Sequence, residues 1–336
     1  MTSSISLTNK QEQRFRSLVF LTIIVIYLVI LAGGIVRSTG SGMGCPDWPK
    51  CFGRWVPPTE ISQLPVNYQA IYGAKLKGEV EFNPLKTWIE YANRLVGVLS
   101  GFFVFATLIA SLSYLRRDKV IFWGSLGAFL LIGANGWLGS QVVATELAPH
   151  MITIHMLLAI ALVFALLFVL LRASAPKQPR ILNAASQQRL LLVAIALTLG
   201  QIVLGTQVRD ALDIVAKSFD YTNRESWIDQ LDWRFYIHRS FSLVLLAFHL
   251  FVIYRLRKLN VVGRISDLIK ALFAVVVIEI GTGVLMAYFG VPAVAQPIHL
   301  VLALVMIGLQ FSIWFLVTPT LLVANQLSQK SRFVEV

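Results

Sequence analysis

Residues 90–117 read "EYANRLVGVLSGFFVFATLIASLSYLRR", and this stretch decides the architecture of the chain. After Arg94 it runs for about 20 residues without a charge and then ends in two arginines, which suits a helix that crosses a bilayer. Residues 234–258, "RFYIHRSFSLVLLAFHLFVIYRLRK", repeat the polar start, the length and the basic end. The sequence therefore contains an internal repeat of membrane-spanning helices.

Aligning Asn93 with His238 extends this repeat along the chain. The interval from Asn93 to His155 is longer by a single position than the interval from His238 to His299. The later of the two positions is a histidine in both copies, His155 and His299. The earlier position is His238 in the second copy but Asn93 in the first.

The repeat predicts an all-α integral membrane protein whose eight transmembrane helices form two pseudo-symmetric four-helix bundles. The first half covers residues 1–180 and the second covers residues 181–336. The stretch "GGIVR" ending at Arg37 matches "GTQVR" ending at Arg209, and the long loop 37–89 follows the opening helix of the first half. The predicted spans are residues 17–36, 91–115, 120–144, 152–171, 190–208, 235–254, 266–288 and 298–320.

The composition agrees with a chain that lies mostly within a bilayer. Of its 336 residues 57% are hydrophobic and only 14% are charged, with a mean hydropathy of +0.72. About 17 lysines and arginines fall in the two tails and the short connections on one side, and about nine fall in the two long loops opposite. We therefore expect both termini in the cytoplasm. This orientation accounts for the net charge of +12, so we expect membrane lipid and no nucleic acid as a partner.

The loop of residues 37–89 then lies outside the cytoplasm and contains both cysteines of the chain, Cys45 and Cys51. A disulfide persists in such a compartment. The pair either closes a small ring as a structural staple or works as a redox pair.

Three histidines lie within a turn or two of the outer ends of their predicted helices. His238 and His299 begin the second and fourth helices of one half at equal depth. Facing helices of a bundle can hold a bis-histidine haem between two such imidazoles. The alternatives are interfacial histidines bonded to neighbouring carbonyl groups and, less favoured, a zinc site, which needs more ligands than this level of the half supplies.

Four arginines lie near the same outer level. Arg209 and Arg239 in the second half, and Arg37 and Arg94 in the first, are candidates to bind the propionates of a haem. Ordinary snorkelling toward the interface is the alternative.

The first half differs from the second at two positions. Asn93 stands where the repeat has a histidine, so a haem iron bound there by His155 has an open face, as oxygen chemistry requires. Glu90 lies one helical turn before Asn93 and aligns with Phe235. A partly buried carboxylate can exchange protons, although a carboxylate at a helix start is also favoured by the helix dipole.

Six stretches together resemble the haem A synthase family of inner-membrane oxygenases. They are "GGIVRSTGSGMGCPDWPKC", "WIEYANRLVG", "LGSQVV", "ITIHMLLA", "YIHR" and "QPIHLVLALV", in this order over nearly the whole chain. The family's usual first-half pattern is Glu-Tyr-x-His-Arg, from which Asn93 departs.

The resemblance implies an enzyme that oxidises the C8 methyl group of haem O to a formyl group in two successive oxidations, giving haem A for terminal oxidases. It implies haem b at His238 and His299, the substrate haem at His155, and Glu90 as a catalytic carboxylate. Molecular oxygen is the expected oxidant, and the location is the bacterial inner membrane. A haem O synthase is a candidate partner.

Two other classes of function remain open from the sequence. A membrane di-haem b electron-transfer protein would use the second half in the same way, and a haem carrier would bind haem without altering it. The electron donor is unknown, and a homo-oligomer is left open. Glu279, alone near the middle of the seventh predicted span, has no assigned role.

Overall fold

The computed structural model describes residues 2–73, 82–174 and 184–318, and eight helices in these ranges are long and apolar enough to cross a membrane. The long helices are α1 (Thr2–Ser38), α3 (Pro84–Ser111), α4 (Lys119–Ala144), α5 (Pro149–Ser174), α6 (Ala185–Ser218), α7 (Trp233–Arg257), α8 (Arg264–Tyr288) and α9 (Ala295–Leu316). A short helix, α2 (Tyr68–Gly73), lies in the loop between α1 and α3. The prediction of an all-α, multi-pass membrane protein is confirmed.

Polar side chains cap the starts of three of these helices. Asn83, Asp118 and Asp232 each accept a hydrogen bond from a backbone N–H two or three residues further on, at 3.0 to 3.2 Å. Such caps satisfy N–H groups that have no partner within the helix. They begin α3, α4 and α7 just outside the apolar runs.

The observed helices differ in length from the predicted spans. The sequence predicts a span that ends at residue 208, but α6 continues to Ser218. Hydropathy detects only the apolar part of a helix, and the last turns of α6 contain Asp210 and Asp213. The predicted last span ends at 320, whereas α9 ends at Leu316, and residues 319 and 320 lie outside the described ranges.

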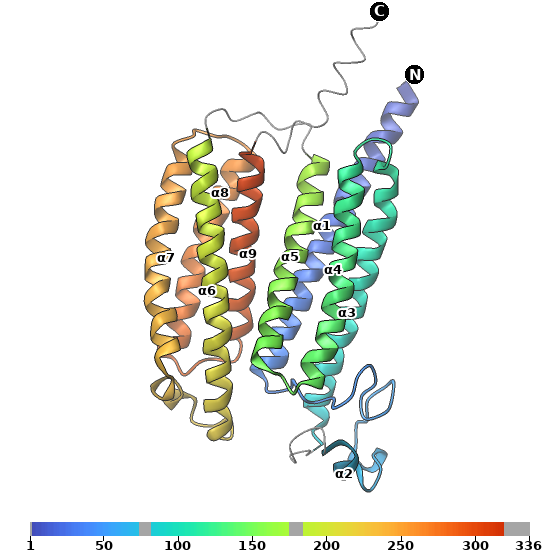
Figure 1. Ribbon diagram of the computed structural model, residues 1–336, viewed down its shortest axis with the longest axis vertical. Coiled ribbons are helices and arrows are strands. Elements are labelled where there is room, and N and C mark those ends of the chain that lie inside the picture. Colours follow the sequence, from blue (N-terminus) through green and yellow to red (C-terminus); the bar gives the residue numbers. More distant parts are fainter. Residues whose placement is uncertain (1, 74–81, 175–183, 319–336) are drawn as a thin grey trace, which may run out of the picture.

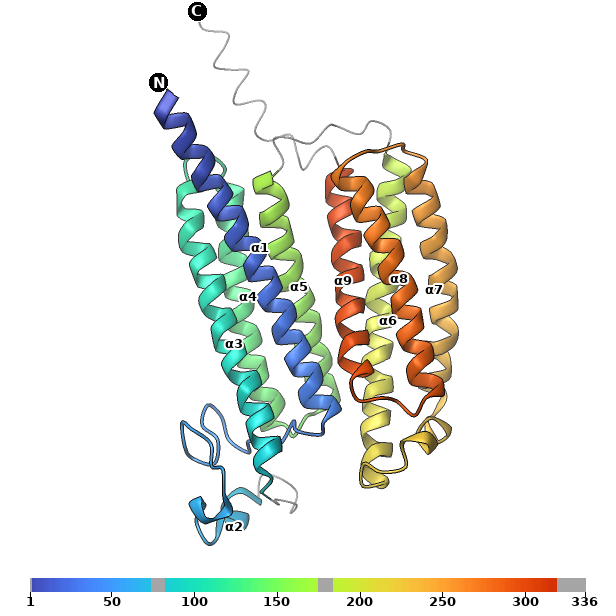
Figure 2. The same cartoon turned by 180° about the vertical axis from the view of Figure 1, so that it is seen from behind.

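The long helices run side by side along one axis. Figures 1 and 2 show α1, α3, α4 and α5 as neighbours and α6, α7, α8 and α9 as neighbours, with α9 packed against α1 and α5. Phe164 of α5 stacks on Phe311 of α9 with ring centroids 4.6 Å apart. A Cβ at Gly34 of α1 would lie 2.8 Å from the Cβ of Pro297, so glycine permits the close approach of α1 to α9.

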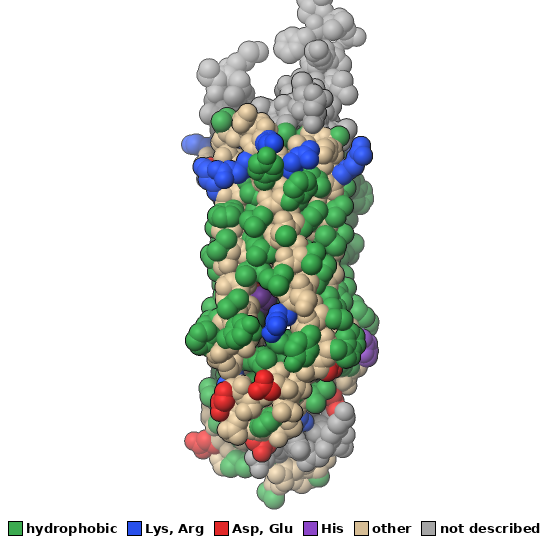
Figure 3. Space-filling view, turned by 90° about the vertical axis from the view of Figure 1, so that its left-hand side faces the viewer, with side chains coloured by type: hydrophobic (Ala, Val, Ile, Leu, Met, Phe, Trp, Pro, Cys, Tyr) green, Lys and Arg blue, Asp and Glu red, His purple; other side chains and the backbone are tan. Residues whose placement is uncertain are grey.

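The two ends of the molecule differ in charge. Helix α1 begins and α9 ends at the same end (Figure 1). Figure 3 shows lysine and arginine side chains gathered toward that end, and aspartate and glutamate gathered toward the other. The basic side chains include Arg255, Arg257, Lys258, Arg264 and Lys270, near the junction of α7 and α8.

The first loop folds beside the acidic end, next to the outer ends of α3 and α4 (Figure 1). Cys45 and Cys51 form a disulfide and are both fully buried. Around them pack Phe52, Leu64 and Tyr68, with further aromatic side chains. The loop therefore has a small hydrophobic core of its own, held together by the disulfide.

Candidate functional site

A glycine of the preceding long helix lies against each of the four repeated side chains. In the first half, an added Cβ would lie 4.0 Å from Asn93 at Gly33 and 3.7 Å from His155 at Gly139. In the second half, it would lie 3.3 Å from His238 at Gly205 and 3.6 Å from His299 at Gly283. The four pairs join α1 to α3, α4 to α5, α6 to α7 and α8 to α9. Asn93 therefore occupies the same structural position as the three histidines.

His238 and His299 lie in the second turns of α7 and α9, two helices of the second half. Nδ1 of His238 is buried and has no hydrogen-bond partner among the described residues. Nδ1 of His299 instead lies 2.9 Å from Oγ1 of Thr282 and 3.3 Å from Oε1 of Glu279. These imidazoles are thus available as a pair, and one of them has polar support from α8.

At its two repeated positions, the first half has one imidazole, His155, and one amide, Asn93. Nδ1 of His155 and Oδ1 of Asn93 are both buried without a hydrogen-bond partner in the described part of the chain. A buried polar atom without a partner is rare and costly, so each such atom calls for a ligand or another explanation. Both halves therefore have unsatisfied polar atoms at the repeated positions.

A buried ion pair of α3 holds the disulfide loop, residues 41–56, through hydrogen bonds to the loop backbone. Oε1 of Glu90 lies 2.5 Å from Nη2 of Arg94, and Oε2 accepts a hydrogen bond of 2.8 Å from the backbone N–H of Cys45. Arg94 also donates to the backbone carbonyls of Cys45, Asp47 and Lys50, at 3.0, 2.7 and 2.9 Å. Glu90 is only 4% exposed, so this carboxylate joins the loop to the turn of α3 that contains Asn93.

Two neighbouring contacts bring the loop backbone onto the helix. The hydroxyl of Thr87 donates to the carbonyl of Gly44 at 2.9 Å. A Cβ at Gly44 would lie 2.5 Å from the carbonyl oxygen of Lys86, a distance that no other residue type tolerates without movement. Glycine at this position therefore permits the hydrogen bonds of Cys45.

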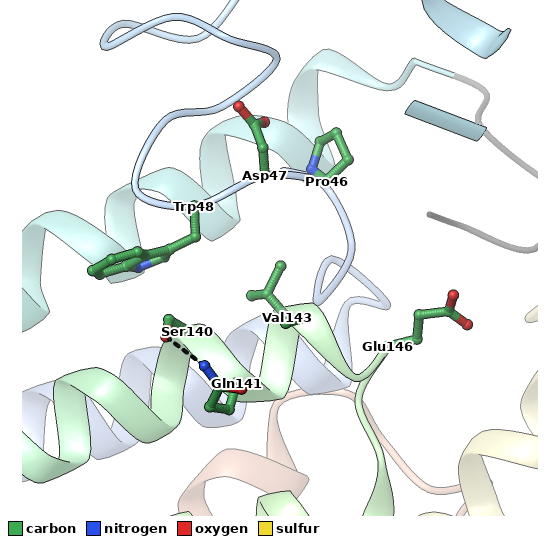
Figure 4. A pocket seen from close by; sticks show the side chains of 8 residues that line it. Pro46, Asp47, Trp48, Ser140, Gln141, Val143 and Glu146 are labelled. Carbon is green, nitrogen blue, oxygen red and sulfur yellow. Dashed lines mark hydrogen bonds between the residues drawn. The ribbon is translucent and has the colours of Figure 1, made fainter. Parts of the chain in front are cut away.

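A pocket of about 420 Å³ lies between the disulfide loop and the C-terminal end of α4. Figure 4 shows Asp47 and Trp48 on the loop side and Ser140, Gln141 and Val143 on α4. The pocket is lined by Pro46, Asp47, Trp48, Ser140, Gln141, Val143, Ala144 and Glu146.

Two of the four candidate arginines share one carboxylate. Asp213 of α6 lies 2.6 Å from Arg37 and 2.5 Å from Arg209, and Arg209 also donates to the backbone carbonyl of Arg37 at 2.8 Å. Arg209 donates to Gln296 of α9 as well. Arg239 is exposed at the start of α7. Arg37 and Arg209 therefore connect the C-terminal end of α1 with α6.

The residues that support the candidate groups were not predicted from the sequence. Asp213 and Thr282 were not among the candidates, and Glu279 had no assigned role. One signal was present in the sequence, since Gly139 precedes His155 by the same interval as Gly283 precedes His299. Within the described residues no group of three or more His, Cys, Asp or Glu side chains is arranged to hold a metal ion.

Comparison with known proteins gives a consistent result. The sequence model of the COX15-CtaA family, described as a cytochrome oxidase assembly protein, matches residues 16–311. A protein named Heme A synthase from Shewanella oneidensis is 30% identical over 190 residues, which are 55% of this chain and 54% of the relative. Proteins of the same name from Geobacillus kaustophilus and Bacillus cereus are 27% and 24% identical over 171 and 166 residues. These matches cover 51% and 49% of this chain, and 46% and 45% of the relatives. The chain thus spans about half the length of the curated relatives it matches.

Proposed function

The chain belongs to the COX15-CtaA family of cytochrome oxidase assembly proteins, and on this premise we propose that it is a haem A synthase. It would oxidise the C8 methyl group of haem O to a formyl group in two successive oxidations. The observation that carries this proposal is the fourfold placement of Asn93, His155, His238 and His299 beside glycines of neighbouring helices. Two of these positions form an imidazole pair, and the other two supply one imidazole and one amide.

The second half of the chain, residues 181–336, fits a haem b. Nδ1 of His238 is an unpartnered buried atom among the described residues, and glycines lie against both imidazoles where any Cβ would approach the rings. Two neutral imidazoles on facing helices are a ligand set that haem iron accepts. In this proposal haem b supplies one-electron chemistry, and His238 and His299 hold and orient it.

The first half, residues 1–180, would bind the substrate haem O. His155 is the proposed ligand to its iron, and the side chain of Asn93 lies at the repeated position where the second half has an imidazole. An amide is a poor ligand to haem iron, so this half would leave one face of the substrate open to an oxidant, for which we propose molecular oxygen. We propose that the two halves form pseudo-symmetric four-helix bundles with different tasks.

Glu90 is the proposed catalytic carboxylate. Each of its oxygens accepts one hydrogen bond in the structure and retains a lone pair for a further proton. Because Glu90 is bound to both Arg94 and Cys45, its position depends on the disulfide loop. The loop would then cover the substrate half and fix the carboxylate near the reacting edge.

The charge distribution supports an orientation with both termini in the cytoplasm of a bacterial inner membrane. The basic end of the molecule would face the cytoplasm. The proposed sites and the disulfide loop lie toward the acidic end, which would be extracytoplasmic. The reaction requires a source of electrons and a source of haem O, so an electron donor and a haem O synthase are the proposed partners.

The test is the identity of the haems in the purified protein. The full chain is expressed with a source of haem O, and the extracted haems are separated by chromatography and identified by mass. We expect haem A, or its hydroxymethyl precursor, together with haem b. We expect Glu90→Gln to lose the oxidised products and to retain haem b.

The matched control for Glu90→Gln is Phe235→Tyr, a change at the aligned position of the second half, which should leave the products unchanged. Haem b alone in the wild-type protein, at one per chain, would contradict the synthase. Unaltered haem O beside haem b would instead indicate a haem carrier.

A further inference from the structure

Glu279 is a carboxylic acid in the middle of a membrane-spanning helix. It lies on α8, is 9% exposed, and one of its oxygens, Oε2, is buried without a hydrogen-bond partner in the described ranges. Ionisable groups at this depth are costly and usually act in a site. The other oxygen, Oε1, lies 3.3 Å from Nδ1 of His299, one of the two imidazoles proposed to hold haem b.

The hydrogen bonds around His299 have a defined direction. The hydroxyl of Thr282 donates to the backbone carbonyl of Glu279 at 2.8 Å. Because its proton is used there, its oxygen accepts the contact of 2.9 Å with Nδ1 of His299. Nδ1 therefore carries a hydrogen that it donates to Thr282, and Oε1 of Glu279 lies 3.3 Å from the same nitrogen.

This arrangement fixes the chemistry of the opposite ring nitrogen. In a neutral imidazole with the hydrogen on Nδ1, the lone pair is on Nε2. Acceptors behind a ligand imidazole fix its tautomer and orientation and raise its basicity. The pair Glu279 and Thr282 thus prepares His299 to present Nε2 to a metal.

We propose that Glu279 is a positioning residue which, together with Thr282, orients His299 and lowers the reduction potential of the haem iron in the second half. This inference rests on the proposed haem b site. A more basic imidazole donates more charge to iron and so favours the oxidised form over the reduced form. The carboxylate acts through His299 and does not touch the iron.

The first half lacks this support at the matching positions. In the second half, Glu279 lies four residues before Gly283 and Thr282 lies one residue before it. At the same distances before Gly139, the first half has Asn135 and Leu138. An amide and an aliphatic side chain thus replace the carboxylate and the hydroxyl, and Nδ1 of His155 has no partner in the described residues. The two histidines would therefore hold a haem iron in different electrostatic surroundings, which suits one site that transfers electrons and one that binds substrate.

The experiment measures the midpoint potential of haem b in the purified full-length protein by spectroelectrochemical titration. The variants are Glu279→Gln, which keeps the shape and removes the carboxylate, and Thr282→Val, which removes the hydroxyl. For Glu279→Gln we expect the equilibrium to shift tenfold toward reduced haem, a rise of about 59 mV for a one-electron couple. Thr282→Val should shift it in the same direction.

The matched control is Gln310→Met, at a fully buried polar position of α9 in the same half. The amide of Gln310 bonds to His249 and Thr198, so its loss should affect stability but leave the potential unchanged. If Glu279→Gln prevents haem binding, Thr282→Val supplies the measurement alone. In each variant that binds haem, electron paramagnetic resonance should still report two histidine ligands.

A potential equal to that of the wild type in both variants would overturn the inference, as would an equal rise in the control. The outcome is separate from that of the proposed function. A shifted potential in a protein that makes no haem A would support the role of Glu279 and contradict the synthase. Absence of haem b from the wild-type protein would overturn both.

Discussion

The ion pair that holds the disulfide loop gives a quantitative prediction. Arg94→Ala removes four hydrogen bonds that Arg94 donates, one to the carboxylate of Glu90 within α3 and three to backbone carbonyls of the disulfide loop. The side chains of Arg94 and Glu90 are only 13% and 5% exposed, so the pair is screened little by water. Removing one partner of a buried ion pair costs about 3–5 kcal/mol, because the other charge remains buried. We take about 3 kcal/mol as the lower limit for the loss in loop stability.

Hydrogen exchange measured by mass spectrometry provides the assay. The backbone N–H of Cys45 donates to Glu90, so its exchange reports directly on the opening of the loop. A loss of about 3 kcal/mol corresponds to exchange about 100-fold faster, since each factor of ten is about 1.4 kcal/mol. The matched control is Arg239→Ala, because Arg239 is the repeat counterpart of Arg94 but is exposed. If exchange in residues 41–56 of Arg94→Ala changes by less than about threefold, Arg94 does not hold the loop on α3.

Three further perturbations have defined outcomes. Cys51→Ala removes a cross-link with a sequence separation of six and should destabilise the loop by about 2 kcal/mol. We expect faster cleavage of the loop by trypsin, and an unchanged cleavage rate would contradict this. Asn93→His should give the iron held by His155 a second imidazole, so that a high-spin signal in electron paramagnetic resonance becomes low-spin; a persistent high-spin signal would count against the assigned position. A hydrogen bond from Arg234 lowers the pKa of Asp232, so its contribution to stability is present at neutral pH and is lost as the pH falls through the folded-state pKa. The difference in thermal stability between the wild type and Asp232→Asn should therefore shrink on acidification, and a constant difference would contradict this.

The helices and the repeat were predictable because they depend on properties that recur along the chain. Apolar runs of about 20 residues are long enough to cross a bilayer whatever their neighbours are. The nearly equal spacing from Asn93 to His155 and from His238 to His299 shows which side chains occupy equivalent positions. The structure confirms eight candidate spans and places a glycine beside each of these four residues.

The partners of these residues were not predictable, because they come from segments far apart in the sequence. Nothing near Arg94 indicates that it donates to carbonyl groups of the disulfide loop, which lies much earlier in the chain. The shared use of Asp213 by Arg37 and Arg209 depends in the same way on the packing of α1 near α6. Hydropathy also hides single polar residues within a span, which is why Glu279 had no role until the position of His299 was known.

We propose that the first half binds the substrate haem and the second half binds haem b. The most direct test is the haem content of two variants, His155→Ala and His299→Ala, purified with a haem O source and analysed by chromatography and mass. We expect His155→Ala to retain haem b but to contain neither haem O nor haem A, and we expect His299→Ala to lose haem b. Retention of haem b in His299→Ala together with its loss from His155→Ala would contradict this assignment of the two halves.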